Sequence, residues 1–263
     1  MGTHYPLPFF ATSDLLPAPL PTPGAIAASQ DILQENSGRR VVRVGIYFVV
    51  KYGAAVNLTE GENMLFIKQF SKTSTPTVYA IYSLQPKGDK SPTNYILMEN
   101  IQANHESNLA TCAKFLHLTT LGVLGKRPFE DSVFWAGDDA SCQVASGPFD
   151  SEKQMLDAMD KKYSRQNPVY RKSEYYSRIL PLMLRGHASI FTHGDFQRKN
   201  IVVAEDGEVV IIDWEAAGWY PSFWEYSTAM FSCRWDNDWH SWIPQILDEH
   251  PNEYAWMDMV FRD

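Results

Sequence analysis

Cysteine is scarce in this sequence, and the three cysteines that occur are far apart. Cys112, Cys142 and Cys233 form no C-x-x-C pair, and the seven histidines show no ligand spacing. This pattern argues against a disulfide framework and a zinc site, and it is typical of reduced thiols in a cytoplasmic protein. We therefore expect a cytoplasmic location. His193 is expected to hold its loop through a backbone hydrogen bond.

The 263 residues also lack a long apolar run and an excess of basic charge. The apolar runs are too short to span a bilayer, so no membrane partner is expected. Pro6 and Pro8 interrupt an N-terminus without a basic region, which argues against a signal peptide. The formal net charge of −8 argues against a nucleic-acid partner. It is compatible with a cationic substrate, although solubility alone explains it better.

Two short β-branched runs flank a turn in the C-terminal half of the sequence. They cover residues 201–203 and 209–212, and the Asp-Gly pair between them is a strong hairpin signal. We therefore predict two antiparallel strands joined by a tight turn. Such a hairpin places Asn200, at the start of its first strand, close to Asp213, at the end of its second strand.

An amide and a carboxylate at the ends of one hairpin suit a magnesium ion, which prefers oxygen ligands. Asp195 precedes Asn200 by five residues, on a loop where it can face a substrate hydroxyl and accept its proton. The pattern therefore predicts phosphoryl transfer, with Asp195, Asn200 and Asp213 as catalytic residues. Asn200 and Asp213 are the expected metal ligands. Each part alone is also typical of an ordinary turn or strand end, and only the ordered combination favours an enzyme.

The segments HGDFQRKNIVV and IIDWE, which begin at His193 and Ile211, carry a family resemblance. They resemble the catalytic loop and metal-binding strand of the aminoglycoside phosphotransferase/choline kinase family. Similarity to fungal members of uncertain substrate extends over about residues 30–242, through RRVVRVGIYFVVKYG, GENMLFI, NYILMENIQ and LGKRPF. Gly194 stands where protein kinases have Arg, and Asp-Trp-Glu stands where they have Asp-Phe-Gly. Both features favour the small-molecule branch.

The resemblance implies ATP and Mg²⁺ as cofactors, and it assigns the residues that contact the nucleotide phosphates. Lys51 closes the second of two predicted strands, at residues 41–44 and 46–50. It matches the lysine that contacts the α- and β-phosphates and pairs with a helix glutamate. Glu60 and Glu62 both lie on the next predicted helix, and they point in different directions. The family spacing favours Glu60 as the partner.

Two further strands are predicted at residues 79–84 and 95–98, and the segment after them resembles the hinge of the family. Backbone groups of Glu99 and Ile101 are expected to meet the adenine edge. The sequence departs from the kinase pattern in two places. No G-x-G-x-x-G precedes the lysine strand, where only Asn-Ser-Gly comes before Arg39, and the stretch after the hinge is short.

The expected fold class is α+β, a two-lobed protein-kinase-like fold. A small antiparallel-sheet N-lobe with one helix at residues 30–98 binds the nucleotide, and a larger, mainly helical C-lobe at residues 99–263 carries the catalytic and substrate groups. Residues 1–29 are rich in proline and are expected to form a flexible or extended leader. Docking of this leader through Phe9, Phe10, Leu15 and Leu16 is the alternative. The C-lobe helices are expected at residues 104–118, 150–163, 173–186, 222–231 and near 240–247.

The sequence therefore predicts an ATP-dependent kinase that moves the γ-phosphate to a hydroxyl of a small molecule, as aminoglycoside phosphotransferases do. Two alternatives stay open. One is a catalytically weak or inactive nucleotide-binding protein of the same fold, and the other is a protein-kinase-like enzyme. Asp236 and Asp238 are weak candidates for binding amino groups of the substrate, although a solvated acidic loop explains them better.

Overall fold

The computed structural model describes residues 5–85, 91–102, 149–166, 171–233, 235 and 237–262. The chain forms two compact units. The first, here the sheet unit, comprises residues 4–115 and 199–215, and the second, here the helical unit, is built mainly from residues 116–198 and 216–263. The helix predicted at residues 104–118 and the LGKRPF segment lie outside the described residues. In the part of the chain that the structure describes, no helix is long and apolar enough to cross a membrane.

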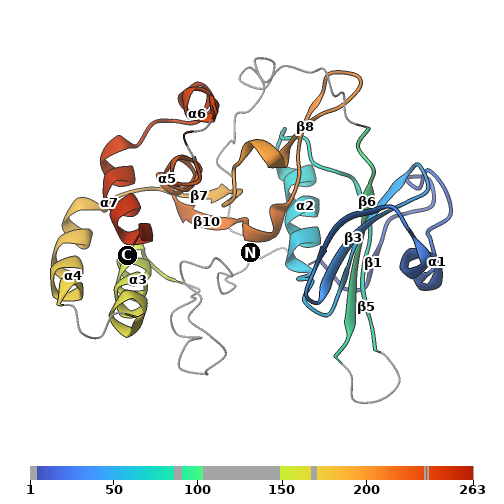
Figure 1. Ribbon diagram of the computed structural model, residues 1–263, viewed down its shortest axis with the longest axis horizontal. Coiled ribbons are helices and arrows are strands. Elements are labelled where there is room, and N and C mark those ends of the chain that lie inside the picture. The colour runs from blue at the N-terminus through green and yellow to red at the C-terminus, as the bar shows by residue number, and fades with distance from the viewer. Residues whose placement is uncertain are drawn as a thin grey trace. The chain divides into compact units, whose positions relative to one another are not determined.

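The sheet unit is built around a six-stranded antiparallel sheet (Figure 1). The strands, in order across the sheet, are β1 (Phe9–Phe10), β5 (Val78–Leu84), β6 (Thr93–Glu99), β4 (Phe48–Gly53), β3 (Arg39–Val44) and β2 (Ile32–Asn36). The unit also holds helices α1 (Pro23–Ala28) and α2 (Thr59–Phe70) and the hairpin of β8 (Ile201–Val203) and β9 (Val209–Ile211). The antiparallel sheet expected from the sequence is confirmed.

One face of the sheet packs against α1. The register places Val42 opposite Val50, and Val50 opposite Leu97, so these three side chains share a face. Ile26 of α1 is fully buried among them. This cluster forms the apolar core on that side of the sheet.

The described part of the N-terminal stretch belongs to this unit. Phe9 and Phe10 pair with β5, and the Thr22 hydroxyl caps α1, whose first residue is Pro23. The structure places Phe9 and Phe10 against the sheet, as the docking alternative expects, whereas the Leu15 side chain is 59% exposed. Proline is well tolerated at the first position of a helix, and the buried Ile26 supplies the apolar contact that keeps this stretch on the sheet.

The other face of the sheet packs against α2. Ile96 lies opposite both Ile81 and Lys51, so these three side chains share this face. A Cβ atom on Gly61 would lie 2.6 Å from Ile81 Cδ1 and 3.4 Å from Ile96 Cγ2. The helix therefore approaches the sheet at a point where only a hydrogen atom fits, next to Glu60.

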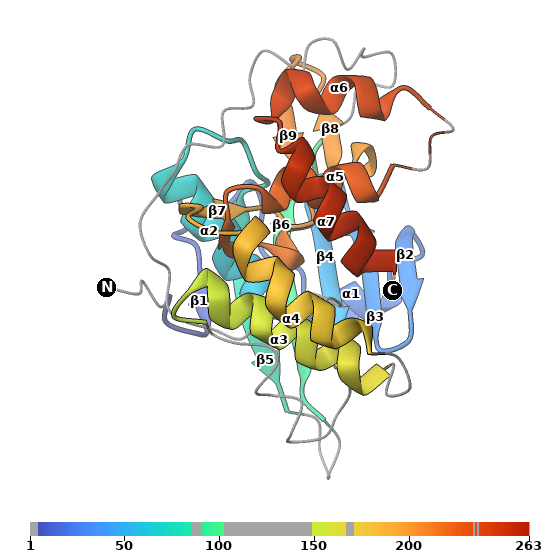
Figure 2. The ribbon, with the colours of Figure 1, turned by 90° about the vertical axis from the view of Figure 1, so that its left-hand side faces the viewer.

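The helical unit packs its helices around a core of large apolar side chains. The helices are α3 (Glu152–Gln166), α4 (Lys172–Met183), α5 (Trp224–Phe231), α6 (Trp239–Ile246) and α7 (Pro251–Arg262). Helices α3 and α4 lie side by side (Figure 2), and Tyr176, Leu180, Trp224 and Met257 are almost fully buried in the shared core. Of these helices, α7 was not predicted.

A short antiparallel pair of strands, β7 (Ser189–Thr192) and β10 (Gly218–Pro221), leads into and away from the predicted catalytic region. The sequence analysis missed this pair, because each strand is only four residues long and β10 begins with glycine and ends with proline.

Gly61→Val should lower the free energy of unfolding by roughly 2–3 kcal/mol, because the new side chain overpacks the buried Ile81. Urea unfolding measures the change. Gly24→Val on α1 is the matched control, since a Cβ there would meet only Thr22 Oγ1, at 4.0 Å. Equal losses of stability in the two variants would contradict close packing at Gly61.

Candidate active site

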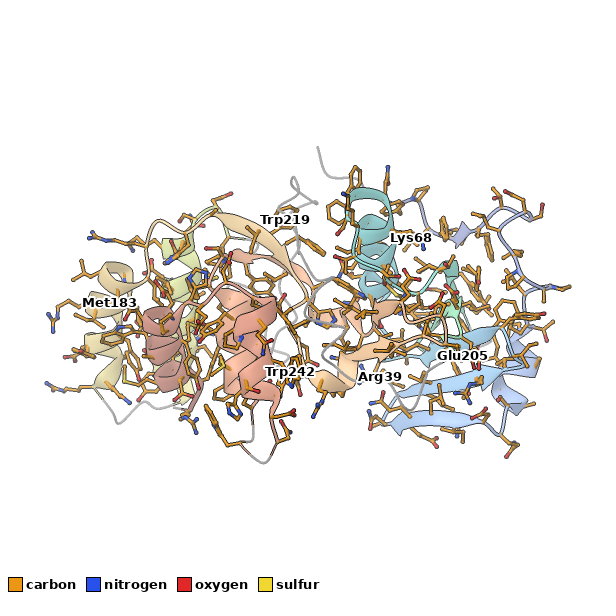
Figure 3. The ribbon with its side chains drawn as sticks, turned by 90° about the horizontal axis from the view of Figure 1, so that it is seen from above. Arg39, Lys68, Met183, Glu205, Trp219 and Trp242 are labelled. Carbon is orange, nitrogen blue, oxygen red and sulfur yellow. The ribbon has the colours of Figure 1, made fainter. Side chains whose placement is uncertain are left out.

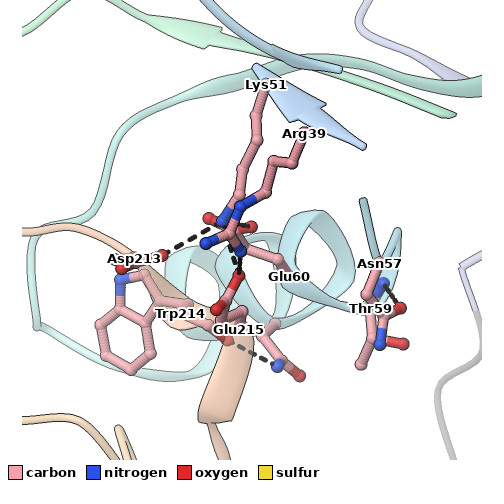
Figure 4. Close-up of polar contacts among 9 residues, drawn as sticks. Arg39, Lys51, Asn57, Thr59, Glu60, Asp213, Trp214 and Glu215 are labelled. Atoms are coloured by element: carbon pink, nitrogen blue, oxygen red, sulfur yellow. Dashed lines mark hydrogen bonds and ion pairs between the residues drawn. The ribbon is translucent and has the colours of Figure 1, made fainter. Parts of the chain in front are cut away.

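Lys51 lies on β4 with its ammonium group among three carboxylates (Figure 4). Lys51 Nζ is 2.5 Å from Glu60 Oε2, 2.8 Å from Glu215 Oε2 and 3.1 Å from Asp213 Oδ1. Because β4 runs on to Gly53, Lys51 lies inside its strand. The prediction that Lys51 closes the strand is wrong in this detail, since Tyr52 and Gly53 continue the pairing with β6.

Burial and neighbouring charges act on Lys51 in opposite directions. Removal from water lowers the pKa of Lys51, but the attraction of Glu60, Asp213 and Glu215 outweighs this effect, so the pKa lies above its ordinary value. Burial raises the pKa of Glu60 to about 7, against the attraction of Lys51. Lys51 therefore keeps its positive charge at neutral pH and offers a fixed cation.

The partner of Lys51 on α2 is Glu60. The Glu60 side chain is only 3% exposed and lies in the first turn of the helix. Residues two apart on a helix point in different directions, which gives Glu62 another environment. The expected pairing of Lys51 with Glu60 is confirmed by the 2.5 Å contact. The role of this pair in binding a nucleotide stays a prediction.

The hairpin of β8 and β9 forms as the sequence predicts. Ile201 lies opposite Ile211, and Gly207 turns the chain with a φ of 86°. The Ile212 N–H donates to the Asn200 carbonyl at 2.9 Å, so Asn200 and Asp213 lie at neighbouring ends of the hairpin. Their roles as metal ligands stay predictions.

Asp213 has a left-handed backbone, with a φ of 64°. This conformation is uncommon outside glycine, asparagine and aspartate, and it often marks functional sites. It turns the chain from β9 into the 3₁₀ turn Trp214–Ala216. Trp214 is fully buried, and its carbonyl accepts a hydrogen bond from the Asn63 side chain of α2 at 3.0 Å. This anchor lets Asp213 and Glu215, on either side of it, both reach Lys51.

Arg39 and Glu215 are site residues to which the sequence analysis gave no role. Arg39 begins β3 and belongs to the sheet unit (Figure 3), and its Nη1 donates to Glu215 Oε2 at 2.5 Å. Burial raises the pKa of Glu215, but Lys51 and Arg39 hold it below its ordinary value. The sequence features that could have pointed to these two residues were the Arg directly after Asn-Ser-Gly and the Glu of Asp-Trp-Glu. No linear pattern pairs residues 176 positions apart.

Oxygens of Glu60, Asp213 and Glu215 all lie within 4.8 Å of one another. Within the described residues, these three are the group of acidic side chains that could hold a metal ion. Carboxylate oxygens are the ligands that Mg²⁺ prefers. The partly exposed Asp213 and Glu215 fit this ion, whereas the buried Glu60 is held by Lys51. The sequence analysis expected Asn200 beside Asp213 as ligands, and the structure adds Glu60 and Glu215 to the acids around Asp213.

The expected adenine-binding residues lie where β6 ends. The Glu99 N–H donates to the Thr77 carbonyl at 2.9 Å, and the Glu99 side chain accepts from the Thr77 N–H at 3.0 Å. The Asn100 N–H donates to the Tyr47 carbonyl at 2.9 Å. These bonds fix the backbone ahead of Ile101. The roles of Glu99 and Ile101 in binding adenine stay predictions.

The loop that carries Asp195 belongs to the helical unit, and a buried glutamate holds it. Glu225 Oε2 accepts from the His193 N–H at 2.5 Å, and Glu225 Oε1 accepts from the Gly194 N–H at 3.1 Å. His193 Nδ1 accepts from the Asp195 N–H at 3.2 Å, which confirms that His193 holds its loop. The Gln197 side-chain amide donates to Asp195 Oδ1. The catalytic role of Asp195 stays a prediction.

Glu225 was not predicted as a functional residue from the sequence. An acid inside the apolar run Phe-Trp-Glu-Tyr could have indicated a buried carboxyl group. The Glu225 side chain lies in the first turn of α5. Burial raises the pKa of Glu225 to about 7, although the His193 and Gly194 N–H groups favour its charged form.

Gly194 has a steric reason to be glycine. Its φ is 81°, and a Cβ atom would lie 2.5 Å from the Ala216 carbonyl oxygen. The arginine that protein kinases carry at this point therefore has no room in this loop.

Asp238, a weak candidate for binding a cationic substrate, already has partners. Asp238 Oδ1 is 2.9 Å from Arg198 Nη1, and Asp238 Oδ2 accepts from Trp242 Nε1 at 3.0 Å. Asp236 lies outside the described residues.

Residues 77–259 match the model of the phosphotransferase enzyme family, APH. No curated protein in the comparison matches the chain significantly. A thermostable mutant of aminoglycoside phosphotransferase APH(4)-Ia, in its apo form, is similar in structure, with a TM-score of 0.53, 15% identity and coverage of 85% of this chain and 79% of that chain. ADP-bound APH(2'')-Ib has a TM-score of 0.52 and 14% identity, with coverage of 88% of this chain and 78% of that chain.

The GDP and kanamycin complex of APH(2'')-IIia has a TM-score of 0.51 and 13% identity, with coverage of 89% of this chain and 83% of that chain. Identities this low show a shared, kinase-like fold and nothing finer. The family match is independent of them and spans more than half of the sequence. It confirms the resemblance to the aminoglycoside phosphotransferase/choline kinase family: this chain belongs to the phosphotransferase enzyme family.

Glu225→Ala should lower the free energy of unfolding by roughly 1–3 kcal/mol for each of the two N–H groups that lose their acceptor. Glu225→Gln is the matched variant, because its single amide oxygen still accepts one of the two bonds. At pH 6, where the Glu225 carboxyl is mainly protonated, urea unfolding should rank both wild type and Gln above Ala. An Ala variant as stable as wild type would contradict the role of Glu225 in holding the loop.

The same residue should make stability depend on pH. Because the folded pKa of Glu225 is about 7, above its ordinary value of 4.5, folded Glu225 binds more protons than unfolded Glu225 between these values. Its contribution to stability is therefore fully present below pH 4.5 and is lost as pH rises through 7. The difference in unfolding free energy between wild type and Glu225→Gln should shrink from pH 5 to pH 8. A difference that grows would contradict the assigned direction.

Proposed function

We propose that this protein is an ATP-dependent phosphotransferase that moves the γ-phosphate of ATP to a hydroxyl group of a small molecule. The Lys51–Glu60 ion pair, with Asp213 beside it, carries the proposal. Kinase-like enzymes use a strand lysine paired with a helix glutamate to hold the α- and β-phosphates. Membership of the phosphotransferase enzyme family supports the reaction class.

Mg²⁺ is the proposed metal cofactor. When bound, it neutralises the charge that develops on the phosphates during transfer. Asp213 and Asn200 would hold the ion, and the partly exposed Asp213 carboxylate supports this role. Glu99 and Ile101 are proposed to bind the adenine edge through their backbone, as part of a nucleotide-binding lobe at residues 30–98.

Asp195 is proposed to orient the acceptor hydroxyl and to take its proton. In the balanced step, the bond from the γ-phosphorus to the bridging oxygen breaks, a bond to the acceptor oxygen forms, and the hydroxyl proton passes to the Asp195 carboxylate. The hydrogen bonds from the Asp195 backbone to His193, and from Gln197 to Asp195, support a fixed position for this carboxylate. Asp195 belongs to the proposed catalytic and substrate lobe, residues 99–263.

The acceptor class to test first is a small amine that carries hydroxyl groups. One similar structure holds kanamycin, and another holds AMP-PNP and hygromycin B. The net charge of −8 also suits a cationic substrate. Thermal-shift titration with ATP and Mg²⁺, followed by ATP turnover with amines, sugars and amino alcohols, tests the proposal. Stabilisation by nucleotide without turnover on any acceptor would instead support the inactive nucleotide-binding alternative.

Asp195→Asn should retain nucleotide affinity and lose turnover by about 10²–10⁴-fold, the range for loss of a general base. Coupled ATP-turnover kinetics and equilibrium nucleotide titration measure the two effects separately. Asp206→Asn is the matched control, because Asp206 lies exposed in the hairpin turn and asparagine can still accept the Glu208 N–H. Turnover retained in Asp195→Asn would remove Asp195 from the proposed role.

Asp213→Asn should lose the Mg²⁺-dependent part of nucleotide binding. Asparagine tolerates the left-handed backbone of this position, so the fold should be preserved while the negative charge is lost. Wild type should gain about 2.7 kcal/mol of stability at a ligand concentration of 100 Kd, and the variant much less. Melting temperatures with ADP, in Mg²⁺ and in EDTA, measure this. An equal response to Mg²⁺ in both proteins would contradict the metal assignment.

A further inference from the structure

One carboxylate oxygen in the sheet unit is shared by two cationic side chains. Glu215 Oε2 lies 2.5 Å from Arg39 Nη1 and 2.8 Å from Lys51 Nζ (Figure 4). Arg39 comes from the start of β3 and Lys51 from the interior of β4, so two neighbouring strands aim their positive charges at a single point. That point is a preformed position for an anionic oxygen.

The two glutamates that contact Lys51 differ in their freedom to leave it. The Glu60 side chain is 3% exposed, and the Glu215 side chain is 39% exposed. Moving the buried Glu60 carboxylate would leave the ammonium group without its closest partner. Glu215 can turn into water at little cost, because a half-exposed carboxylate is easily hydrated and exposed ion pairs are weak. Glu60 is thus the permanent partner of Lys51, and Glu215 is the replaceable one.

We propose that Glu215 occupies the position of a nucleotide phosphate oxygen, and that Arg39 and Lys51 bind the phosphate once Glu215 has moved away. This inference rests on the proposed function. A phosphate group carries more negative charge and more acceptor oxygens than a carboxylate, and a guanidinium group binds it with two parallel hydrogen bonds. The exchange therefore favours the nucleotide, and Glu215 reduces its apparent affinity by competing for the same two cations.

The position of Arg39 explains how this chain works without a glycine-rich loop. Arg39 directly follows the Ser37–Gly38 turn between β2 and β3, and this turn is fixed by a 2.9 Å bond from the Ala55 N–H to the Gly38 carbonyl. A glycine-rich loop would cover the phosphates with backbone N–H groups. Here a side-chain cation on the strand after the turn supplies the contact.

A second role for Glu215, as a ligand of the metal ion, gives the opposite prediction. Glu215 belongs to the acidic group that could hold a cation. A metal ligand strengthens nucleotide binding in Mg²⁺, so its neutralisation would weaken binding. A competitor for phosphate weakens binding, so its neutralisation would strengthen binding, with or without Mg²⁺.

The test measures equilibrium dissociation constants of adenosine, ADP and ATP by titration calorimetry, in Mg²⁺ and in EDTA, without an acceptor. Glu215→Gln should bind ATP and ADP about 3–10-fold more tightly in both conditions, because a charged acceptor is replaced by a neutral one. Arg39→Met should bind ATP and ADP about tenfold more weakly. Neither variant should change the affinity for adenosine, which has no phosphate.

Glu35→Gln and Arg40→Met are the matched controls. Arg40 Nη2 and Glu35 Oε1 form a 2.5 Å ion pair in the same β2–β3 hairpin, with the side chains 32% and 54% exposed. The two control substitutions make the same chemical changes at a position away from Lys51. They should therefore leave the nucleotide affinity unchanged. In the Arg39→Met background, Glu215→Gln should raise the nucleotide affinity less than it does in wild type. The reason is that the two side chains contact each other.

Weaker ATP binding by Glu215→Gln in Mg²⁺ would overturn the competition and assign Glu215 to the metal. Arg39→Met with the ATP affinity of Arg40→Met would overturn the phosphate contact. In both cases wild type still binds ATP, and the proposed function stands. A wild-type protein that binds neither ADP nor ATP would overturn the proposed function and this inference with it.

Discussion

The buried ammonium group of Lys51 is the constraint on which the sheet unit depends. A charge removed from water is costly unless partners compensate it. Glu60 compensates it from α2, and Asp213 and Glu215 do so from the chain after β9. The chain after β9, with Asp213 162 residues beyond Lys51, must therefore meet the neighbouring elements β4 and α2 at one point. The close approach of α2 to the sheet at Gly61, one residue from Glu60, makes the meeting sterically feasible.

The charges around Lys51 are nearly balanced, and this balance gives the cluster its chemical character. Glu60, Asp213 and Glu215 carry three negative charges when ionised, and Lys51 and Arg39 carry two positive ones. A divalent cation and a polyphosphate can each find partners in such a cluster, which is the requirement of phosphoryl transfer. The Glu60 carboxylate is buried, whereas the Asp213 and Glu215 carboxylates are partly exposed, so solvent reaches only the last two of the three acids.

In the helical unit, a buried glutamate is compensated by backbone N–H groups. The His193 and Gly194 N–H groups both donate to the Glu225 side chain, and Gly194 has a left-handed backbone. A buried carboxylate thereby fixes the loop just ahead of Asp195. The same contact geometry, with the Ala216 carbonyl close to Gly194, excludes the arginine of protein kinases by sterics alone.

The sequence by itself determined the elements whose signals are local. The Asp-Gly turn and its β-branched flanks predict the hairpin of β8 and β9, and the apolar run just before Lys51 predicts its strand. The docking of the N-terminal stretch through Ile26 and the pairing of β7 with β10 were decided by tertiary structure, because short or proline-rich segments carry weak local preference. The contacts of Arg39, Glu215 and Glu225 were also decided there. An ion pair or an acceptor bond between distant residues depends on where the fold brings them, and no spacing in the chain encodes that distance.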